Sequence, residues 1–144
     1  MYKIPETRPF EDEVYAMFPR GANAAHVKKH RDKNPVYVAL ERFISQSKQR
    51  RCLPDNVTRD DLRPFAEEQV RLTAATGISF SIDHITPVAL GGQSVPDNLI
   101  VIPNWLNMIK HTKVVPDIPA YKELVSRVIM SHLQTVSNHS TNTI

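Results

Sequence analysis

Cysteine, glycine and long hydrophobic runs are all scarce in this chain, and each scarcity excludes a class of protein. Cys52 is the only cysteine among the 144 residues, which excludes an internal disulfide and a Cys-rich zinc site and fits a reducing compartment. No apolar run approaches the roughly 20 residues that span a bilayer, and the opening residues MYKIPETRPFEDEVY lack the hydrophobic core of a signal peptide. We therefore expect a cytoplasmic protein with no membrane partner.

Glycine is rare, yet two of the four glycines, Gly91 and Gly92, are adjacent. They lie between an Asp-His pair at 83–84 and an Asn-Leu pair at 98–99. A glycine pair permits positive φ, which other residues resist, and so allows a sharp turn. We expect a loop here that folds back tightly and leaves His84 uncovered.

Positive charge is concentrated in one segment. The net charge is only +3, but residues 20–51 contain nine Lys or Arg against two acidic residues, whereas the chain from residue 59 onward is nearly balanced. Such a segment has the polarity of a surface that meets phosphate, although a solvated helix face produces the same pattern. Charge alone leaves both interpretations open.

Hydrophobic periodicity predicts a mostly helical α+β protein with one short β element, in a length that suits a single domain. Asn34-Pro35 is a good helix start, because Asn can cap and proline is tolerated at the first helical position. Pro64 is tolerated only in a first turn, so we expect the next helix to begin at Asp60 or Asp61 and not after a cap at Thr58. The expected helices cover 11–18, 35–50, 60–76, 104–112 (capped by Asn104) and 117–135, and the expected strands cover 78–82 and 99–102.

Polar residues with metal-ligand chemistry end the first strand and lie on the helix after the second. Asp83 and His84 are at the strand end, while Asn107 and His111 are four residues apart and so share one helical face. A carboxylate, a carboxamide and an imidazole suit a divalent cation, and the oxygen ligands favour Mg²⁺ or Mn²⁺. Adjacent strand residues point to opposite faces, so Asp83 and His84 can serve one site only where the chain leaves strand geometry.

The stretch SIDHITPVALGGQSVPDNLIVIPNWLNMIKHTK carries a spaced motif: DHI-x-P, a Gly pair, Asn-Leu and N-x-x-K. Asn98 lies fourteen residues after His84, and Asn107 lies nine residues further on. This pattern resembles the HNH endonucleases, in particular small phage-encoded members. The resemblance covers about residues 76–113 and implies a ββα-metal core, two short antiparallel strands plus a helix, packed among flanking helices. It divides one compact domain into a basic helical region at 1–76, the core at 77–115, a packing helix at 116–136 and a disordered tail at 137–144.

The resemblance implies a role for each motif residue. His84 would be the general base that takes a proton from water, and Asp83 and Asn107 would hold the metal ion. Asn98 would serve catalysis structurally, by tying down the loop so that His84 points correctly. His111 matches the position of a further metal-binding histidine in nuclease-toxin members, and Asn107 stands where many members have histidine. The carboxamide shifts the expected metal to Mg²⁺, with Mn²⁺ next, ahead of Zn²⁺ or Ni²⁺.

The resemblance also implies a partner, namely DNA, cleaved to 5′-phosphate and 3′-hydroxyl ends in the cytoplasm, or the host cytoplasm for a phage protein. A monomer would nick one strand, and a homodimer would cut both. Two alternatives stay open: a catalytically silent DNA-binding module on the same fold, and a cytotoxic nuclease with an immunity partner. The basic helices would grip DNA, and the expected DNA-contacting residues are Lys28, Lys29, Lys48, Arg50, Arg51, Lys110 and Lys113.

Overall fold

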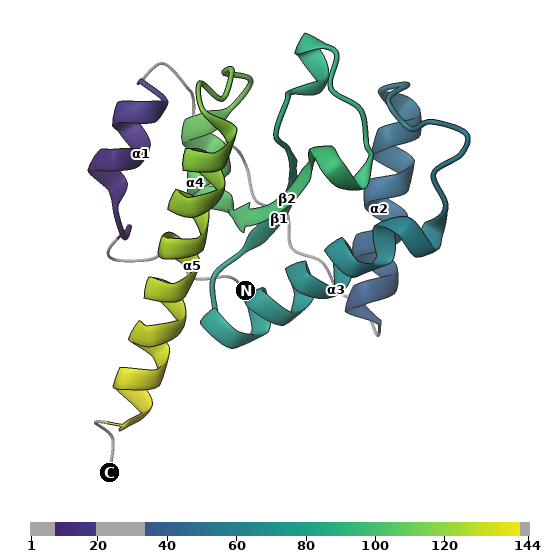
Figure 1. Ribbon diagram of the computed structural model, residues 1–144. Coiled ribbons are helices and arrows are strands. Elements are labelled where there is room, and N and C mark those ends of the chain that lie inside the picture. Colours follow the sequence, from purple (N-terminus) through teal and green to yellow (C-terminus); the bar gives the residue numbers. More distant parts are fainter. Residues whose placement is uncertain (1–7, 20–33, 142–144) are drawn as a thin grey trace.

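The computed structural model describes residues 8–19 and 34–141 and confirms the α+β class, with helices around a two-stranded sheet (Figure 1). None of the helices in these two ranges is long and apolar enough to cross a membrane. The elements are α1 (Glu11–Met17), α2 (Pro35–Gln49), α3 (Arg59–Thr76), β1 (Phe80–His84), the 3-10 turns η1 (Val88–Leu90) and η2 (Pro96–Asn98), β2 (Leu99–Pro103), α4 (Asn104–Lys110) and α5 (Ile118–Thr141).

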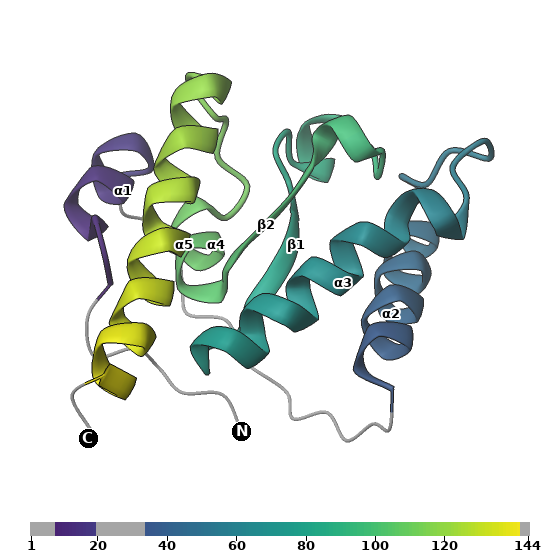
Figure 2. The same ribbon diagram turned by 60° about the horizontal axis from the view of Figure 1, so that its bottom comes forward.

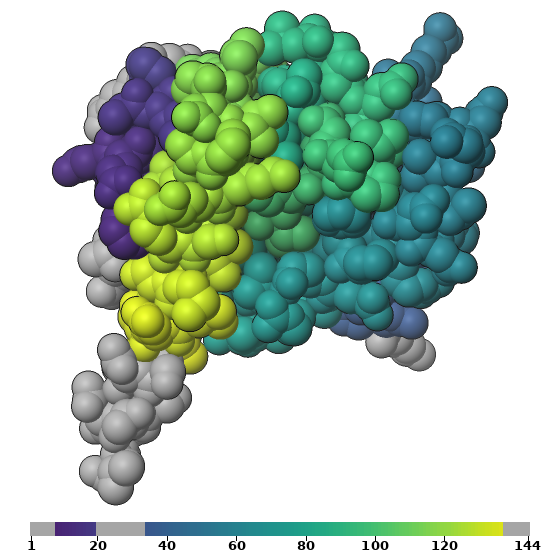
Figure 3. Space-filling model, in the orientation of Figure 1, coloured from purple at the N-terminus to yellow at the C-terminus, as the bar shows by residue number. Residues whose placement is uncertain are grey.

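The sheet lies between two groups of helices. β1 and β2 pair antiparallel, from Phe80 opposite Pro103 to His84 opposite Leu99. Seen from below, α2 and α3 lie on one side of the strands and α1, α4 and α5 on the other (Figure 2). In the space-filling view these flanks enclose the β1–β2 segment from both sides (Figure 3). The base and the loop of the predicted motif are therefore held between two separately packed helical units.

Each helical unit has its own apolar core, which explains why so short a sheet is stable. One core joins α2 and α3 to β2 and consists of Leu40, Phe43, Ile44, Leu62, Ala66 and Leu99. The larger core joins α1, α4 and α5 to the sheet, takes in Leu72 of α3, and includes Ile102, Trp105, Leu106, Tyr121, Leu124 and Val128. Burial of these side chains supplies most of the driving force for folding, so no zinc or disulfide is required.

The start of α2 is as the sequence predicts. The Asn34 side chain accepts a hydrogen bond from the Tyr37 amide at 3.1 Å, and Pro35 occupies the first turn. Leu40, Phe43, Ile44 and Ser47 form the buried face. The opposite face and the C-terminal end of α2 remain exposed, and they carry the basic residues of this helix.

The predicted start of α3 is wrong. The helix begins at Arg59 after an N-cap at Thr58, and Pro64 lies inside it. Thr58 and Asp61 form a reciprocal capping box, with hydrogen bonds of 2.8 and 3.2 Å, which satisfies two backbone donors at the helix end. Proline removes only the hydrogen bond to the carbonyl of Asp60, an exposed residue whose carbonyl lies within reach of water.

Two further boundaries differ from the prediction. Asn104 is the first residue of α4 and not its cap, because its side chain is bonded to the hydroxyls of Ser79 and Ser81 and so holds α4 against β1. The C-terminal helix α5 continues to Thr141, so residues 137–141 are helical where a disordered tail was expected. Residues 142–144 lie outside the described chain.

Candidate active site

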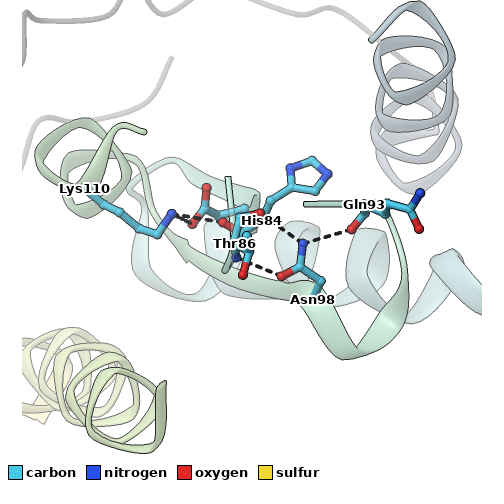
Figure 4. A network of polar contacts seen from close by, with 6 residues as sticks. His84, Thr86, Gln93, Asn98 and Lys110 are labelled. Carbon is cyan, nitrogen blue, oxygen red and sulfur yellow. Dashed lines mark hydrogen bonds and ion pairs between the residues drawn. The ribbon is translucent and has the colours of Figure 1, made fainter. Parts of the chain in front are cut away.

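The loop between the strands is held by Asn98. Its Oδ1 accepts a hydrogen bond from the Thr86 amide at 2.8 Å, and its Nδ2 donates to the carbonyls of Thr86 and Gln93 at 3.1 and 3.0 Å (Figure 4). The amide of Ile85 donates to the backbone carbonyl of Asn98 at 2.8 Å. One side chain thus ties both ends of the loop directly behind His84, as the structural role predicted for Asn98 requires, and its contribution to catalysis stays a prediction.

The two adjacent glycines serve different purposes. Gly91 has φ of 93° and ends η1, so it provides the positive φ that we predicted. Gly92 is required for space instead, because a Cβ built on it would lie 1.8 Å from the Thr86 carbonyl oxygen. The loop is therefore closed by backbone contact, and a side chain at position 92 would push apart the segments that Asn98 joins.

Replacing Gly92 with alanine is expected to open this loop. Displacing backbone in a packed region lowers the free energy of unfolding by roughly 1–3 kcal/mol, and we expect the Thr86 amide to lose its protection against hydrogen exchange. Gly77→Ala is the matched control, since Gly77 has φ of 76° with open space around it; it costs roughly 1–2 kcal/mol through strain alone. Unchanged protection of Thr86 in the Gly92 variant would contradict the steric argument.

The expectation that the loop leaves His84 uncovered is wrong: His84 is buried at the end of β1 on the side of α2, because Ser94 of that loop packs against its ring. Its ring stacks on Phe43 with centroids 5.6 Å apart, and its Nε2 lies 2.8 Å from the Ser94 hydroxyl. Burial, reinforced by the positive charges of Arg50 and Lys110, lowers the pKa of His84 to about 4. The imidazole is therefore neutral at neutral pH and has a lone pair available to accept a proton.

The carboxylate of Asp83 leaves β1 on the other side, toward α4 and α5. Its Oδ2 lies 3.1 Å from the Nζ of Lys110, which also donates to the His84 carbonyl at 2.9 Å. The buried Tyr121 hydroxyl lies beside it. Burial raises the pKa of Asp83, and the Lys110 ammonium opposes that shift without cancelling it. In Figure 4 the amine of Lys110 approaches from one side of the strand while the His84 ring points away from it.

Lys110 therefore does not do what we predicted for it. Its side chain has no exposed surface, so it lies out of reach of a DNA phosphate. The physical reason is its place on α4, one turn after the fully buried Leu106 and beside the buried Ile109, which puts Lys110 on the packed face. A buried ammonium requires a counter-ion, and Asp83 supplies it.

A single cavity of about 370 Å³ nevertheless joins the predicted catalytic and metal-binding residues. β1 keeps strand geometry through His84, so the side chains of Asp83 and His84 diverge, but atoms of both residues line this cavity at the strand end. The remaining polar lining comes from β1, from α4 and the two residues after it, and from the C-terminal end of α2. The polar lining residues are Asp83, His84, Ser81, Asn107, His111, Thr112, Gln46, Ser47 and Arg50.

The donor set fits a small hard cation better than a zinc-type site. Oδ2 of Asp83 is buried, so the 11% of this side chain that solvent reaches lies on its other atoms. A carboxylate and a carboxamide among the residues that line one cavity, completed by water and phosphate, would suit Mg²⁺. In residues 8–19 and 34–141, no three His, Cys, Asp or Glu side chains gather around a common point. His111 lies at the cavity with its Nδ1 3.1 Å from the Thr112 hydroxyl, and its role as a third ligand stays a prediction.

The other expected DNA contacts divide into three groups. Lys48, Arg50 and Arg51 are exposed around the C-terminal end of α2, and Arg50 also lines the cavity. Lys113 is half-buried and donates to the Ile109 carbonyl at 3.1 Å. Lys28 and Lys29 lie outside the described residues.

Sequence reasoning missed three residues at this site. Ser94, which contacts His84, follows the glycine pair with no periodic signal that would mark it as buried. Arg50 was expected on the DNA-facing surface in general, but not beside the base. The contact of Tyr121 with Asp83 depends on how α5 packs on the sheet, which a linear pattern does not contain.

Comparison of the chain with protein-family models, with curated proteins and with solved structures finds no match.

Proposed function

We propose that this protein is a metal-dependent endonuclease of the HNH type, in which β1, β2 and α4 form the ββα-metal core. The observation that supports the proposal is the shared cavity, whose lining residues include His84, Asp83, Asn107 and Arg50. The motif spacing from His84 through Asn98 to Asn107 supports the same assignment. Each of these residue types has a defined task in phosphodiester hydrolysis.

His84 acts as the general base. A neutral imidazole at the cavity wall accepts a proton from the attacking water, and the low pKa keeps it in the accepting form across the neutral range. The stack on Phe43 and the hydrogen-bond distance to Ser94 restrict the orientation of the ring. The Asn98 clamp fixes the backbone that immediately follows His84.

Asp83 and Asn107 hold the metal ion, with Mg²⁺ favoured by their oxygen donors. When bound, the ion would neutralise charge on the scissile phosphate and on the departing 3′ oxygen. The Lys110 ammonium favours the ionised form of the Asp83 carboxylate and opposes the effect of desolvation, which nevertheless raises the pKa of this carboxyl overall. A metal ion at this position would favour the same ionised form.

The C-terminal end of α2 meets the DNA backbone. Lys48, Arg50 and Arg51 project from this end, and Arg50 reaches the cavity, where its guanidinium can pair with a phosphate next to His84. The charged C-terminal end of α2 thus lies beside the proposed base, so DNA bound to it would pass close to His84. One active site per chain cuts one strand per encounter, so a monomer nicks DNA.

Supercoiled plasmid is the substrate that tests this function. We expect the purified protein to convert it to the nicked circle in Mg²⁺ and to leave it intact in EDTA. Asn107→Ala should bind DNA and fail to cut. Arg50→Ala should weaken both steps, and its binding should depend less steeply on salt, because one phosphate contact is lost. Intact supercoiled plasmid with the wild-type protein in both Mg²⁺ and Mn²⁺ would refute the proposal.

A catalytically silent DNA-binding module is the second candidate, and one observation favours it. Lys110 already provides Asp83 with a cation, so the carboxylate is paired without any metal ion. A silent module would retard DNA in a native gel equally in Mg²⁺ and EDTA and would never nick it. The plasmid assay and the gel together separate the two functions.

A further inference from the structure

A buried chain of hydroxyl groups lies behind His84. Ser94 Oγ is 2.8 Å from His84 Nε2 and 2.7 Å from Ser47 Oγ, and both serines are almost fully buried. The backbone amide of Ser94 donates to the Cys52 carbonyl at 2.8 Å, and the Cys52 sulfur lies 3.4 Å from Ser94 Oγ. Ser94 is thus held through both its side chain and its backbone by the C-terminal end of α2 and the residues just after it.

We propose that Ser94, supported by Ser47, is a positioning residue that fixes His84 in the tautomer with hydrogen on Nε2. This inference rests on the proposed function, because it assigns Nδ1 as the nitrogen that accepts the proton from water. In this arrangement Nε2–H donates to Ser94 Oγ, and the Ser94 hydroxyl donates onward to Ser47 Oγ. The lone pair of Nδ1 then takes no part in this hydrogen-bond chain, and His84 is a lining residue of the cavity.

The distances also admit an arrangement that reverses the tautomer. Ser47 could donate to Ser94, and Ser94 to Nε2, which would place the hydrogen on Nδ1 and leave no base at the cavity. The ring is not free to rotate and present Nε2 to the cavity, because Phe43 stacks on one face of His84 and Nε2 faces Ser94, which has no exposed surface. The direction of a single hydrogen-bond chain therefore decides whether His84 can act as a base.

The inference gives α2 a second role besides contact with DNA. Ser47 comes from the buried face of α2 and Ser94 from the β1–β2 loop, 47 residues later in the chain. Their contact connects the basic helical region to the catalytic loop at the ring nitrogen itself. A change in the packing of α2 would reach the base through this contact, without any change in β1.

Imidazole ¹⁵N chemical shifts measure the tautomer directly. The experiment uses the full-length, uniformly ¹⁵N-labelled protein near neutral pH, with the His84 signals assigned by their loss in His84→Gln. The proposal predicts that Nε2 carries the hydrogen and Nδ1 does not, and that Ser94→Ala produces a mixture of tautomers. An Nδ1–H tautomer in the wild-type protein would overturn the proposal.

Kinetics test the consequence. We expect Ser94→Ala to lower kcat by roughly tenfold to a hundredfold, as loss of an orienting partner typically does, with KM for DNA unchanged. Ser47→Ala should have a smaller effect in the same direction. Ser79→Ala is the control, because Ser79 also bonds through its hydroxyl, to Asn104, but does not touch His84.

The outcomes distinguish this inference from the proposed function. An equal fall of kcat in Ser79→Ala and Ser94→Ala, with both variants folded by circular dichroism, would show a general packing effect and overturn the positioning role. An unaltered kcat in Ser94→Ala would overturn it as well. Wild-type protein that shows the Nε2–H tautomer but cuts no DNA would instead refute the proposed function, and would leave the assignment of Ser94 to His84 standing.

Discussion

His84→Ala is expected to abolish DNA cleavage while leaving DNA binding at the wild-type dissociation constant. Removal of a general base lowers the rate roughly 10²–10⁴-fold. The remaining rate of nicking should be too low to detect in a plasmid assay. Binding should persist because the charges proposed to meet phosphate belong to the C-terminal end of α2, and the neutral imidazole contributes none. Plasmid nicking in Mg²⁺ and gel retardation in EDTA measure the two properties separately.

The control for this substitution must separate chemistry from packing, because His84 is buried against Phe43. His84→Gln keeps more of the side-chain volume and should also be inactive. His132→Gln is the matched histidine variant: His132 is buried in the other core, accepts from the Trp105 indole at 3.1 Å, and does not line the cavity. It should cut at the wild-type rate. Nicking by a folded His84 variant would assign the base elsewhere.

Much of the fold could be predicted because local signals and tertiary packing agree. The alternation of Ile78, Phe80 and Ile82 predicts a strand, and β1 begins at Phe80 in the middle of it. Asn34-Pro35 predicts the start of α2 for the same reason that the structure shows, a side-chain cap. The prediction failed where two local rules competed, since the capping box at Thr58 outweighs the missing hydrogen bond at Pro64.

The site was predictable in its residues and not in its contacts. Motif spacing identified Asp83, His84, Asn98 and Asn107, and the structure brings all of these except the loop clamp Asn98 to one cavity. Spacing could not show that Asp83 and His84 leave the strand on opposite faces and still share that cavity. The burial of Lys110 could have been read from its position one turn after Leu106, but a basic residue in a nuclease motif suggested phosphate instead.

These contacts change how the flanking helices relate to the core. A chain with one cysteine cannot brace this core with a Cys-rich zinc site. Here α2 reaches His84 through Phe43, Ser47 and Arg50, while α4 and α5 reach the Asp83 carboxylate through Lys110 and Tyr121. Asp83 and His84, the proposed metal ligand and the proposed base, are thus supported from opposite sides, so damage to either group of helices should impair the proposed cleavage through a different residue.

Lys110→Met tests the support of Asp83, and we expect it to be the most destabilising of the substitutions considered. Removing one partner of a buried ion pair costs roughly 3–5 kcal/mol, because the other charge is left uncompensated. Burial already raises the pKa of Asp83, and without the opposing ammonium it rises further. At a pH above the ordinary pKa of aspartate, Asp83 is then protonated in the folded variant but ionised in the unfolded chain. The loss of stability should therefore grow as the pH rises from 5 to 8, measured by urea unfolding at both values.

Lys113→Met is the matched control on the same turn of chain, since Lys113 is half-buried and only donates to a backbone carbonyl. It should change stability little at either pH. The double variant Asp83→Asn with Lys110→Met removes both charges and should recover most of the stability, yet it should not cut DNA, because it lacks the carboxylate that holds the metal ion. Equal unfolding curves for Lys110→Met and Lys113→Met at pH 8 would mean that the Asp83–Lys110 ion pair does not form in solution. The proposed metal site would then have to form without the support of Lys110.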